Sequence, residues 1–346
     1  MPELTLFSPE TASHAYLESR NDYLNAMRRE EMPDDPPTSL EFSINNARGW
    51  ALVKSAEIEA WHLWDTGDMM AELFLIANHD ENNPHLMSVD LRVLKPYRRR
   101  GYAKLLLARA VAFAEKHERT LVNFQTNASI PAGEEVAAHL GATRGLELGM
   151  NQLILSELDR TLLSRWLELA KTKARDFELG FWGKRYPEGE IDAIIELLKV
   201  MNSAPRDALQ EEDGTVTPEE LREMEAYNLA RGVERWVLYA RHKSSGKLAG
   251  FTETHWYPEN PENLEQITTG VIAKYRGNGL GRWLKAAMIQ KVLAERPAVK
   301  RIRTENAHSN APMLAINKAL GFKPYKSEIV WQLEIARLKN YLGQQS

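Results

Sequence analysis

Residues 270–285 read G-V-I-A-K-Y-R-G-N-G-L-G-R-W-L-K, and this stretch decides how the rest of the chain is interpreted. Its first four residues form an apolar run typical of a strand, and apolar residues recur at helical spacing from Leu284 onward. Between the two lies the pattern R-x-x-G-x-G, from Arg276 to Gly281. The stretch therefore predicts a strand, a glycine turn and the start of a helix.

Such a turn favours an anionic ligand. Glycines allow positive φ and let a ligand approach the main chain, and the unpaired N–H groups at a helix start attract phosphate-like anions. The stretch matches neither the dinucleotide fingerprint G-x-G-x-x-G nor the P-loop pattern G-x-x-x-x-G-K-[ST]. Taken alone, it has a second interpretation, in which Gly277, Gly279 and Gly281 only make a tight strand-to-helix connection.

The pattern occurs twice in the chain, which favours the ligand-binding interpretation. Arg98, Gly101 and Ala103 take the places of Arg276, Gly279 and Gly281 in an earlier copy. A Leu-Gly pair follows each copy, with Gly141 lying 43 residues after Arg98 and Gly321 lying 45 residues after Arg276. A repeat with a period near half the chain predicts two domains of one architecture.

These motifs carry a resemblance to a known family. An R-x-x-G-x-G/A turn after a strand, followed about forty residues later by an Asn-containing helix that ends in L-G-F, resembles the acetyl-CoA site of GNAT-type N-acetyltransferases. The doubled arrangement is similar to tandem GNAT proteins such as mycothiol synthase. The resemblance covers nearly the whole chain and implies an α+β fold, with two tandem domains that each hold a mixed, mostly antiparallel central sheet flanked by helices.

The expected domain boundaries follow from the repeat. We expect an N-terminal GNAT-like domain over residues 1–157, a helical connector over 158–174 and a C-terminal GNAT domain over 175–346. The apolar residues of the connector form one stripe, so it should pack on a neighbouring element.

Composition restricts the function further. A net charge of −4 over 346 residues argues against nucleic acid as a partner, because backbone binding relies on clustered positive charge. The chain has no cysteine, no run of about 18 apolar residues and no segment resembling a signal peptide, which predicts a cytoplasmic protein without a membrane partner. The run H-D-E-N-N-P-H at residues 79–85 is interpreted as a hairpin loop rather than a metal site. A monomer or a homodimer is expected.

The resemblance implies that acetyl-CoA is the cofactor and assigns residues to it. In the second copy these are Val271, Ile272, Arg276, Gly277, Asn278, Gly279, Leu280, Gly281, Arg282 and Asn310. In the first copy they are Val93, Leu94, Arg98, Arg99, Arg100, Gly101, Tyr102, Ala103 and Lys104. The N–H of Val271 or of Ile272 would polarise the thioester carbonyl.

Acyl transfer to an amine needs a route for the amine proton and often an acid for the leaving thiolate. Glu265 is the first candidate base, because it should alternate with Ile267, Thr269 and Val271 on one strand face, and Glu253 is the second. Each carboxylate has an alternative interpretation as a solvated or ion-paired strand residue. The acid is water or one of three tyrosines, Tyr275, Tyr257 and Tyr325.

The sequence departs from the family at the position where many members carry a tyrosine as general acid. Counting back from each Leu-Gly pair, that position holds Asn317 in the second copy and Ala137 in the first. The first copy also has Ile130 in place of Asn310. We therefore expect the C-terminal domain to be catalytic. Two functions remain open: N-acetylation of a small-molecule amine, and a non-catalytic CoA-binding regulatory or scaffold protein.

Overall fold

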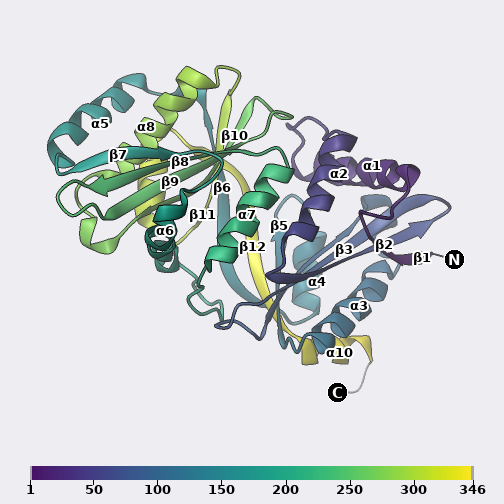
Figure 1. Cartoon of the computed structure of the whole chain (residues 1–346). Coiled ribbons are helices and arrows are strands. Elements are labelled where there is room, and N and C mark those ends of the chain that lie inside the picture. Colours follow the sequence, from purple (N-terminus) through teal and green to yellow (C-terminus); the bar gives the residue numbers. More distant parts are fainter. Residues whose placement is uncertain (1, 344–346) are drawn as a thin grey trace. The chain divides into compact units, whose positions relative to one another are not determined.

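The computed structural model describes residues 2–343, which divide into two compact units (Figure 1). The N-terminal unit contains the chain up to Glu147, the segment Arg206–Asp213 and the chain from Ser327 onward. The C-terminal unit contains Leu148–Pro205 and Gly214–Lys326.

The N-terminal unit is built on one mixed sheet in the order β1-β2-β3-β4-β5-β12. Its strands are β1 (Glu3–Leu6), β2 (Ala56–Asp65), β3 (Asp68–Asn78), β4 (Leu86–Val93), β5 (Leu121–Asn127) and β12 (Lys323–Glu334). All neighbours are antiparallel except β4 and β5. That parallel pair is short, running from Leu86 opposite Leu121 to Val89 opposite Phe124. Beyond this point the two strands are no longer paired with each other.

Helices cover both faces of this sheet. They are α1 (His14–Glu31), α2 (Leu40–Gly49), α3 (Tyr102–Lys116), α4 (Ala132–His139) and α10 (Ile335–Leu342). The side chains of α3 and α10 form the main core with β2, β3, β4 and β5, whereas α1 and α2 pack on Ala60 and Phe74. Ser13 and Ser39 cap α1 and α2, each accepting a hydrogen bond from a backbone N–H of the first turn.

The C-terminal unit repeats the plan in the order β6-β11-β10-β9-β8-β7. Its strands are β6 (Thr143–Ile154), β7 (Phe177–Trp182), β8 (Glu234–His242), β9 (Leu248–Trp256), β10 (Asn263–Val271) and β11 (Arg301–Ala307). Only β10 and β11 are parallel, from Asn263 opposite Arg301 to Gln266 opposite Thr304. Short 3-10 turns join several elements of the chain, namely η1 (Trp50–Leu52), η2 (Lys95–Tyr97), η3 (Leu155–Glu157), η4 (Glu188–Glu190), η5 (Lys199–Ser203) and η6 (Ala273–Tyr275).

The helices of the C-terminal unit also lie on both faces of its sheet, as Figure 1 shows. They are α5 (Arg160–Lys173), α6 (Ile191–Leu198), α7 (Pro218–Ala230), α8 (Leu280–Glu295) and α9 (Ala311–Leu320). The apolar stripe of α5 packs with α8 in the main core, which confirms that this segment packs rather than swings freely. Thr217 begins α7 with a capping box that includes Glu220.

The structure confirms the predicted α+β fold, with mixed, mostly antiparallel strands flanked by helices in each unit. The compact units interleave along the sequence, however. Residues 328–334 of β12 pair with β5 of the first half, and residues 148–154 of β6 pair with β11 of the second half. The domain boundaries expected from the repeat, 1–157 and 175–346, stay a prediction.

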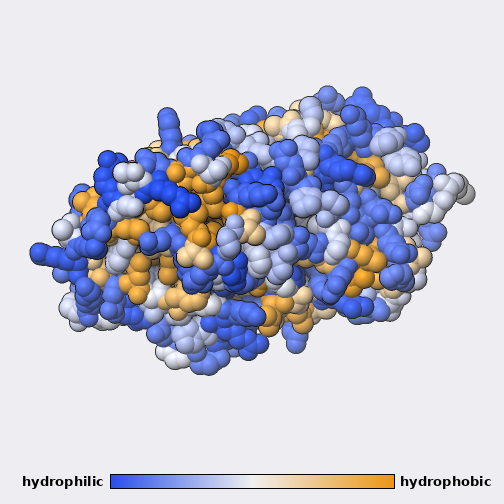
Figure 2. Space-filling model, turned by 90° about the horizontal axis from the view of Figure 1, so that it is seen from above, coloured by the Kyte–Doolittle hydropathy of each residue, from blue (hydrophilic) through white to orange (hydrophobic). Residues whose placement is uncertain are grey.

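Apolar side chains are not confined to the core. Figure 2 shows orange patches on a mainly blue surface, and the most exposed large hydrophobic residues include Leu6 and Met224, both 54% exposed. No helix within residues 2–343 is both long and apolar enough to span a bilayer.

The strand exchange generates a prediction about truncation. A fragment of residues 1–157 lacks β12 and α10, and so loses the buried side chains Ile329, Trp331, Leu333 and Leu338. Burial of each such side chain is worth about 1.5–3 kcal/mol, comparable in sum with the stability of a whole domain. We expect this fragment to lack a cooperative thermal transition by circular dichroism, and co-expression with residues 158–346 to restore one. Cooperative unfolding of the fragment alone would contradict the interleaved arrangement.

Candidate functional site

The glycine turn of the C-terminal unit presents a row of free backbone donors. Gly277 and Gly279 have φ values of +86° and +77°, and Gly279 is the residue before the first turn of α8. Within the described chain, the backbone N–H groups of residues 277–282 donate to no protein acceptor. Because these donors lie at a helix start, the turn is suited to an anionic group such as a phosphate.

Arg276 braces this turn against the strand that precedes it. Its Nε donates to the carbonyl of Val271 at 3.0 Å, and a terminal nitrogen donates to Ser203 Oγ at 2.9 Å. The side chain therefore fixes the shape of the turn through protein partners.

The N-terminal unit repeats this arrangement. Gly101 has a φ of +82° before α3, and Arg98 Nε donates to the carbonyl of Val93 at 2.9 Å. The guanidinium of Arg98 also makes a bidentate ion pair with Glu30, at 2.8 and 2.6 Å. Arg99 takes the left-handed conformation of Gly277, with φ of +65°, and the N–H groups of residues 99–103 have no protein acceptor in the described chain. Both turns thus have the same geometry.

The backbone hydrogen bonds at the strand ends beside the turns distinguish the N–H of Val271 from the N–H of Ile272. The Ile272 N–H bonds the carbonyl of Ala249, and the Leu94 N–H bonds the carbonyl of Met70. Because backbone groups of a strand alternate in direction, the N–H groups of Val271 and Val93 turn the other way, toward the diverging parallel neighbour. The N–H groups of Ile272 and Leu94 are therefore occupied by protein acceptors, whereas those of Val271 and Val93 face the space between the parallel strands.

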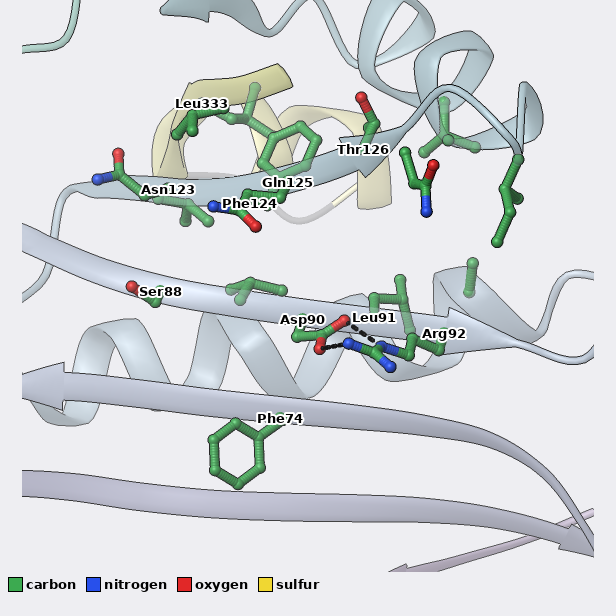
Figure 3. Close-up of a pocket in the computed structure, with 18 of the residues that line it drawn as sticks. Phe74, Ser88, Asp90, Leu91, Arg92, Asn123, Phe124, Gln125, Thr126 and Leu333 are labelled. Carbon is green, nitrogen blue, oxygen red and sulfur yellow. Dashed lines mark hydrogen bonds and ion pairs between the residues drawn. The ribbon is translucent and has the colours of Figure 1, made fainter. Parts of the chain in front are cut away.

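A cavity of about 670 Å³ opens where β4 and β5 diverge, within the N-terminal unit (Figure 3). This volume is in the range of small-molecule and cofactor sites. Its lining includes four residues of the predicted cofactor set, Val93, Arg98, Arg99 and Ala103. The strand divergence and the glycine turn of the N-terminal unit therefore open into one space.

Charged side chains line one side of this cavity. Asp90 and Arg92 on β4 form an ion pair of 2.7 Å, drawn in Figure 3, and Glu31 lies 3.6 Å from Arg92. These carboxylates raise the pKa of the Arg92 guanidinium above its usual range, against the effect of burial, so its positive charge is permanent.

The segment Arg206–Asp213 supplies a further part of the wall, through Leu209 and Glu211. It is tied to the N-terminal unit by hydrogen bonds, including Glu212 N to Asn83 Oδ1 at 2.8 Å and Gln210 N to Gln332 Oε1 at 2.9 Å. Sequence reasoning placed this acidic stretch in the second domain, because neither hydropathy nor charge shows which sheet a loop returns to.

Glu253 of the C-terminal unit is an ion-paired carboxylate on β9. Its oxygens lie 2.8 Å from His255 Nε2 and 3.7 Å from Arg235. Arg235 also approaches Glu225 and stacks over the ring of Tyr186, 3.9 Å from the centroid. This environment matches the ion-paired interpretation of Glu253, and a catalytic role for it stays a prediction.

Glu265 lies on the opposite face of β10 from the one expected. Leu264 and Val271 both pack in the core with α8, although strict alternation would place residues seven apart on opposite faces. A register shift between Gln266 and Thr268 explains this and breaks the predicted alternation. Glu265 is therefore exposed on the face away from Val271, where its charge adds to the effect of burial in raising the pKa of Tyr257.

The remaining sequence candidates have structural partners. Tyr275 stacks on His242 at 5.6 Å between ring centroids and meets Phe177 edge-on at 5.5 Å, which places it with β7 and β8. Asn310 caps α9, its Oδ1 accepting from Met313 N at 3.4 Å. The structure thus does not bring Tyr275 together with Glu253.

Sequence reasoning missed a buried polar trio in the C-terminal unit. Lys285 Nζ donates to Asn317 Oδ1 at 2.8 Å, and Asn317 Nδ2 donates to Asn306 Oδ1 at 2.7 Å. Burial lowers the pKa of Lys285 to about 7. The sequence contained one signal of this trio. Lys285 follows Arg276 at the same distance as Leu107 follows Arg98, so a lysine stands in the second copy where the first copy has an apolar residue.

The fold and these turns agree with comparisons to known proteins. The model of the acetyltransferase (GNAT) family matches residues 22–132 and 194–322, so the chain belongs to this family and is an acyltransferase of the N-acetyltransferase type. Members of the family use acetyl-CoA as the acetyl donor. A search of curated proteins finds no significant match.

Solved structures resemble the chain over nearly its full length. A tandem GNAT protein from the clavulanic acid biosynthesis pathway is 25% identical, with a TM-score of 0.77 over 97% of this chain and 99% of that one. A GCN5-related N-acetyltransferase from Sphaerobacter thermophilus is 14% identical, with a TM-score of 0.65 over 96% of both chains, and shows the fold alone. The predicted tandem GNAT architecture is thereby confirmed.

Lys285 generates a prediction about stability and pH. Its pKa is about 7 in the folded chain and near its ordinary 10.5 when unfolded. Between these values the unfolded chain binds the extra proton, so this residue makes stability rise with pH. We expect Lys285→Met to increase the free energy of unfolding most below pH 7, and this gain to shrink by roughly 1.4 kcal/mol per pH unit between the two pKa values. Urea unfolding at three pH values checks this, and a gain independent of pH would refute it.

Proposed function

We propose that this chain transfers the acetyl group of acetyl-CoA to the amine of a small molecule by direct attack on the thioester. One observation carries the proposal. In both units, a row of free backbone N–H groups at a helix start adjoins a parallel strand pair that diverges. The turn supplies donors for phosphates, and the diverging strands supply free edge groups for an extended, amide-containing arm.

The residues of the C-terminal unit fit this donor. The N–H groups of residues 277–282 would hold the pyrophosphate, and the free edge of β10 would pair with the pantetheine amides. The Val271 N–H, turned toward β11, would polarise the thioester carbonyl. A single well-placed donor of this kind accelerates acyl transfer by about 10²–10³-fold.

The acceptor must reach the thioester as a neutral amine. Glu265 and Glu253 lie on neighbouring strands, on the sheet face that α6 and α7 cover. We propose that Glu265 takes the amine proton, because it is exposed and Glu253 is already paired with His255 and Arg235. Holding amine and thioester together would supply much of the remaining acceleration.

We further propose that the N-terminal unit binds acetyl-CoA in its own cavity, while turnover takes place in the C-terminal unit. The cavity and the second turn support the first part. The second part rests on the fuller glycine turn and on Asn310, which the first copy replaces by Ile130.

The alternative is a non-catalytic CoA-binding regulatory or scaffold protein. Asn317 and Ala137 at the tyrosine positions and the ion-paired state of Glu253 favour it. Release of free thiol from acetyl-CoA in the presence of an amine panel excludes this alternative, whereas cofactor binding without thiol release supports it.

The assignment of turnover to one unit is tested by charge in the turns. Gly279→Glu places a carboxylate among the phosphate donors and strains a residue of φ +77°, so we expect thiol release to fall more than about 100-fold. Gly101→Glu should leave turnover within about threefold. Gly246→Glu is the matched control, because Gly246 has a φ of +67° in the β8–β9 turn with open space around it. Equal losses of thiol release in the Gly279→Glu and Gly101→Glu variants would contradict the assignment of turnover to the C-terminal unit.

The proposed base is tested by amide substitution. Glu265→Gln should lower kcat at pH 7 by about 10²-fold, with a smaller deficit at high pH where the amine is already neutral. Glu253→Gln should mainly affect stability, because it removes the carboxylate that pairs with His255 and leaves Arg235 with Glu225 alone. A kcat for Glu265→Gln equal to that of the unsubstituted protein would rule out this base.

A further inference from the structure

The trio Lys285–Asn317–Asn306 links α8 through α9 to β11 inside the C-terminal unit. Lys285 and Asn317 are each only 1% exposed, and the two hydrogen bonds are 2.8 and 2.7 Å long. Burial alone accounts for the lowered pKa of Lys285, since no charged group contributes to it. The lysine is thus held in the core by an amide and not by a carboxylate.

The trio has a fixed direction of donation. In the structure Lys285 Nζ donates to Asn317 Oδ1, so Asn317 turns its NH₂ group toward Asn306 Oδ1. Asn306 then accepts with its oxygen, which leaves its own NH₂ group for another partner. Lys285 therefore sets the orientation of two amides in series.

This last amide lies where the two parallel strands have separated. Thr304 is the final residue of β11 that pairs with β10, and Asn306 follows it by two positions. Asn317 occupies the helix position at which the family's tyrosine acid is expected. Where many family members carry a tyrosine hydroxyl, this chain thus has two asparagine amides in series, and the second of them, Asn306, lies beside the strand divergence.

Packing does not require the trio, as the N-terminal unit shows. At the corresponding positions relative to Arg98 and Gly141, that unit has Leu107 and Ala137, both buried. Burying a lysine disfavours its charged form strongly. A polar trio where an apolar pair suffices indicates that it serves chemistry in the C-terminal unit.

We propose that the Asn306 amide donates a hydrogen bond to the CoA sulfur as it leaves, with Lys285 and Asn317 as positioning residues. This rests on the proposed function. The amine lone pair forms the new N–C bond, the C–S bond breaks, and the sulfur takes the bonding pair as a thiolate. The amine proton passes to the base, and the thiolate is stabilised by the amide until it is protonated by water.

Two variants test the proposal in a Gly101→Glu background, which isolates the C-terminal site. Asn306→Leu removes the donor, and Lys285→Leu/Asn317→Ala copies the apolar pair of the N-terminal unit and should fold. Both should bind acetyl-CoA within about threefold of the parent and lose about 10- to 100-fold in kcat, the effect of one hydrogen bond to a charged group. Leu106→Met is the control for a core change, because Leu106 is buried in α3 and does not line the cavity, and it should change neither quantity.

A binding measurement separates this role from a structural one. At pH 9 the parent should bind CoA about tenfold more tightly than desulfo-CoA, because the amide donates to the thiolate, and Asn306→Leu should lose this preference. Unchanged kcat and an unchanged preference in Asn306→Leu would overturn the proposal. Failure of the parent to bind acetyl-CoA at all would instead overturn the proposed function. If the parent binds acetyl-CoA but shows no turnover, its preference for CoA over desulfo-CoA at pH 9 still tests the role of the Asn306 amide.

Discussion

The structure depends on one backbone constraint that is repeated in each unit. A parallel strand pair makes four residues of register and then separates, from Val89 and Phe124 onward in one unit and from Gln266 and Thr304 in the other. Beyond that point the backbone N–H and C=O groups on the facing edges of the two strands need other hydrogen-bond partners. The turn arginines supply one, by bonding the carbonyls of Val93 and Val271. The N–H groups that remain, together with those of the following turn, define where a ligand can add to the sheet.

Much of this could be predicted from the sequence, because the constraint leaves a local signature. Positive φ at Gly101, Gly277 and Gly279 favours glycine, and the repeated arginine–glycine spacing identified two units of one fold. The exchange of β6 and β12 between units could not be predicted, since periodicity shows which face of a strand is buried and not which strand it joins. The register shift after Gln266 was equally hidden, and it moved Glu265 to the other face.

The two units use the same framework differently. The N-terminal unit has an apolar pair, Leu107 and Ala137, and a cavity walled partly by the segment Arg206–Asp213. The C-terminal unit has the polar trio of Lys285, Asn317 and Asn306 and two carboxylates on neighbouring strands. A tyrosine is absent from the helix position before each Leu-Gly pair, so the chemistry of the leaving group must come from elsewhere. On our proposal both units bind the cofactor, and this difference confines turnover to the C-terminal unit.

The central claim is that both glycine turns bind the same CoA donor through their backbone N–H groups. Calorimetric titration of acetyl-CoA into the intact chain tests it most directly through the stoichiometry. We expect two sites per chain, reduced to one by either Gly101→Glu or Gly279→Glu and to none by both substitutions. A single site that survives Gly279→Glu, or no binding by the unsubstituted chain, would contradict the claim.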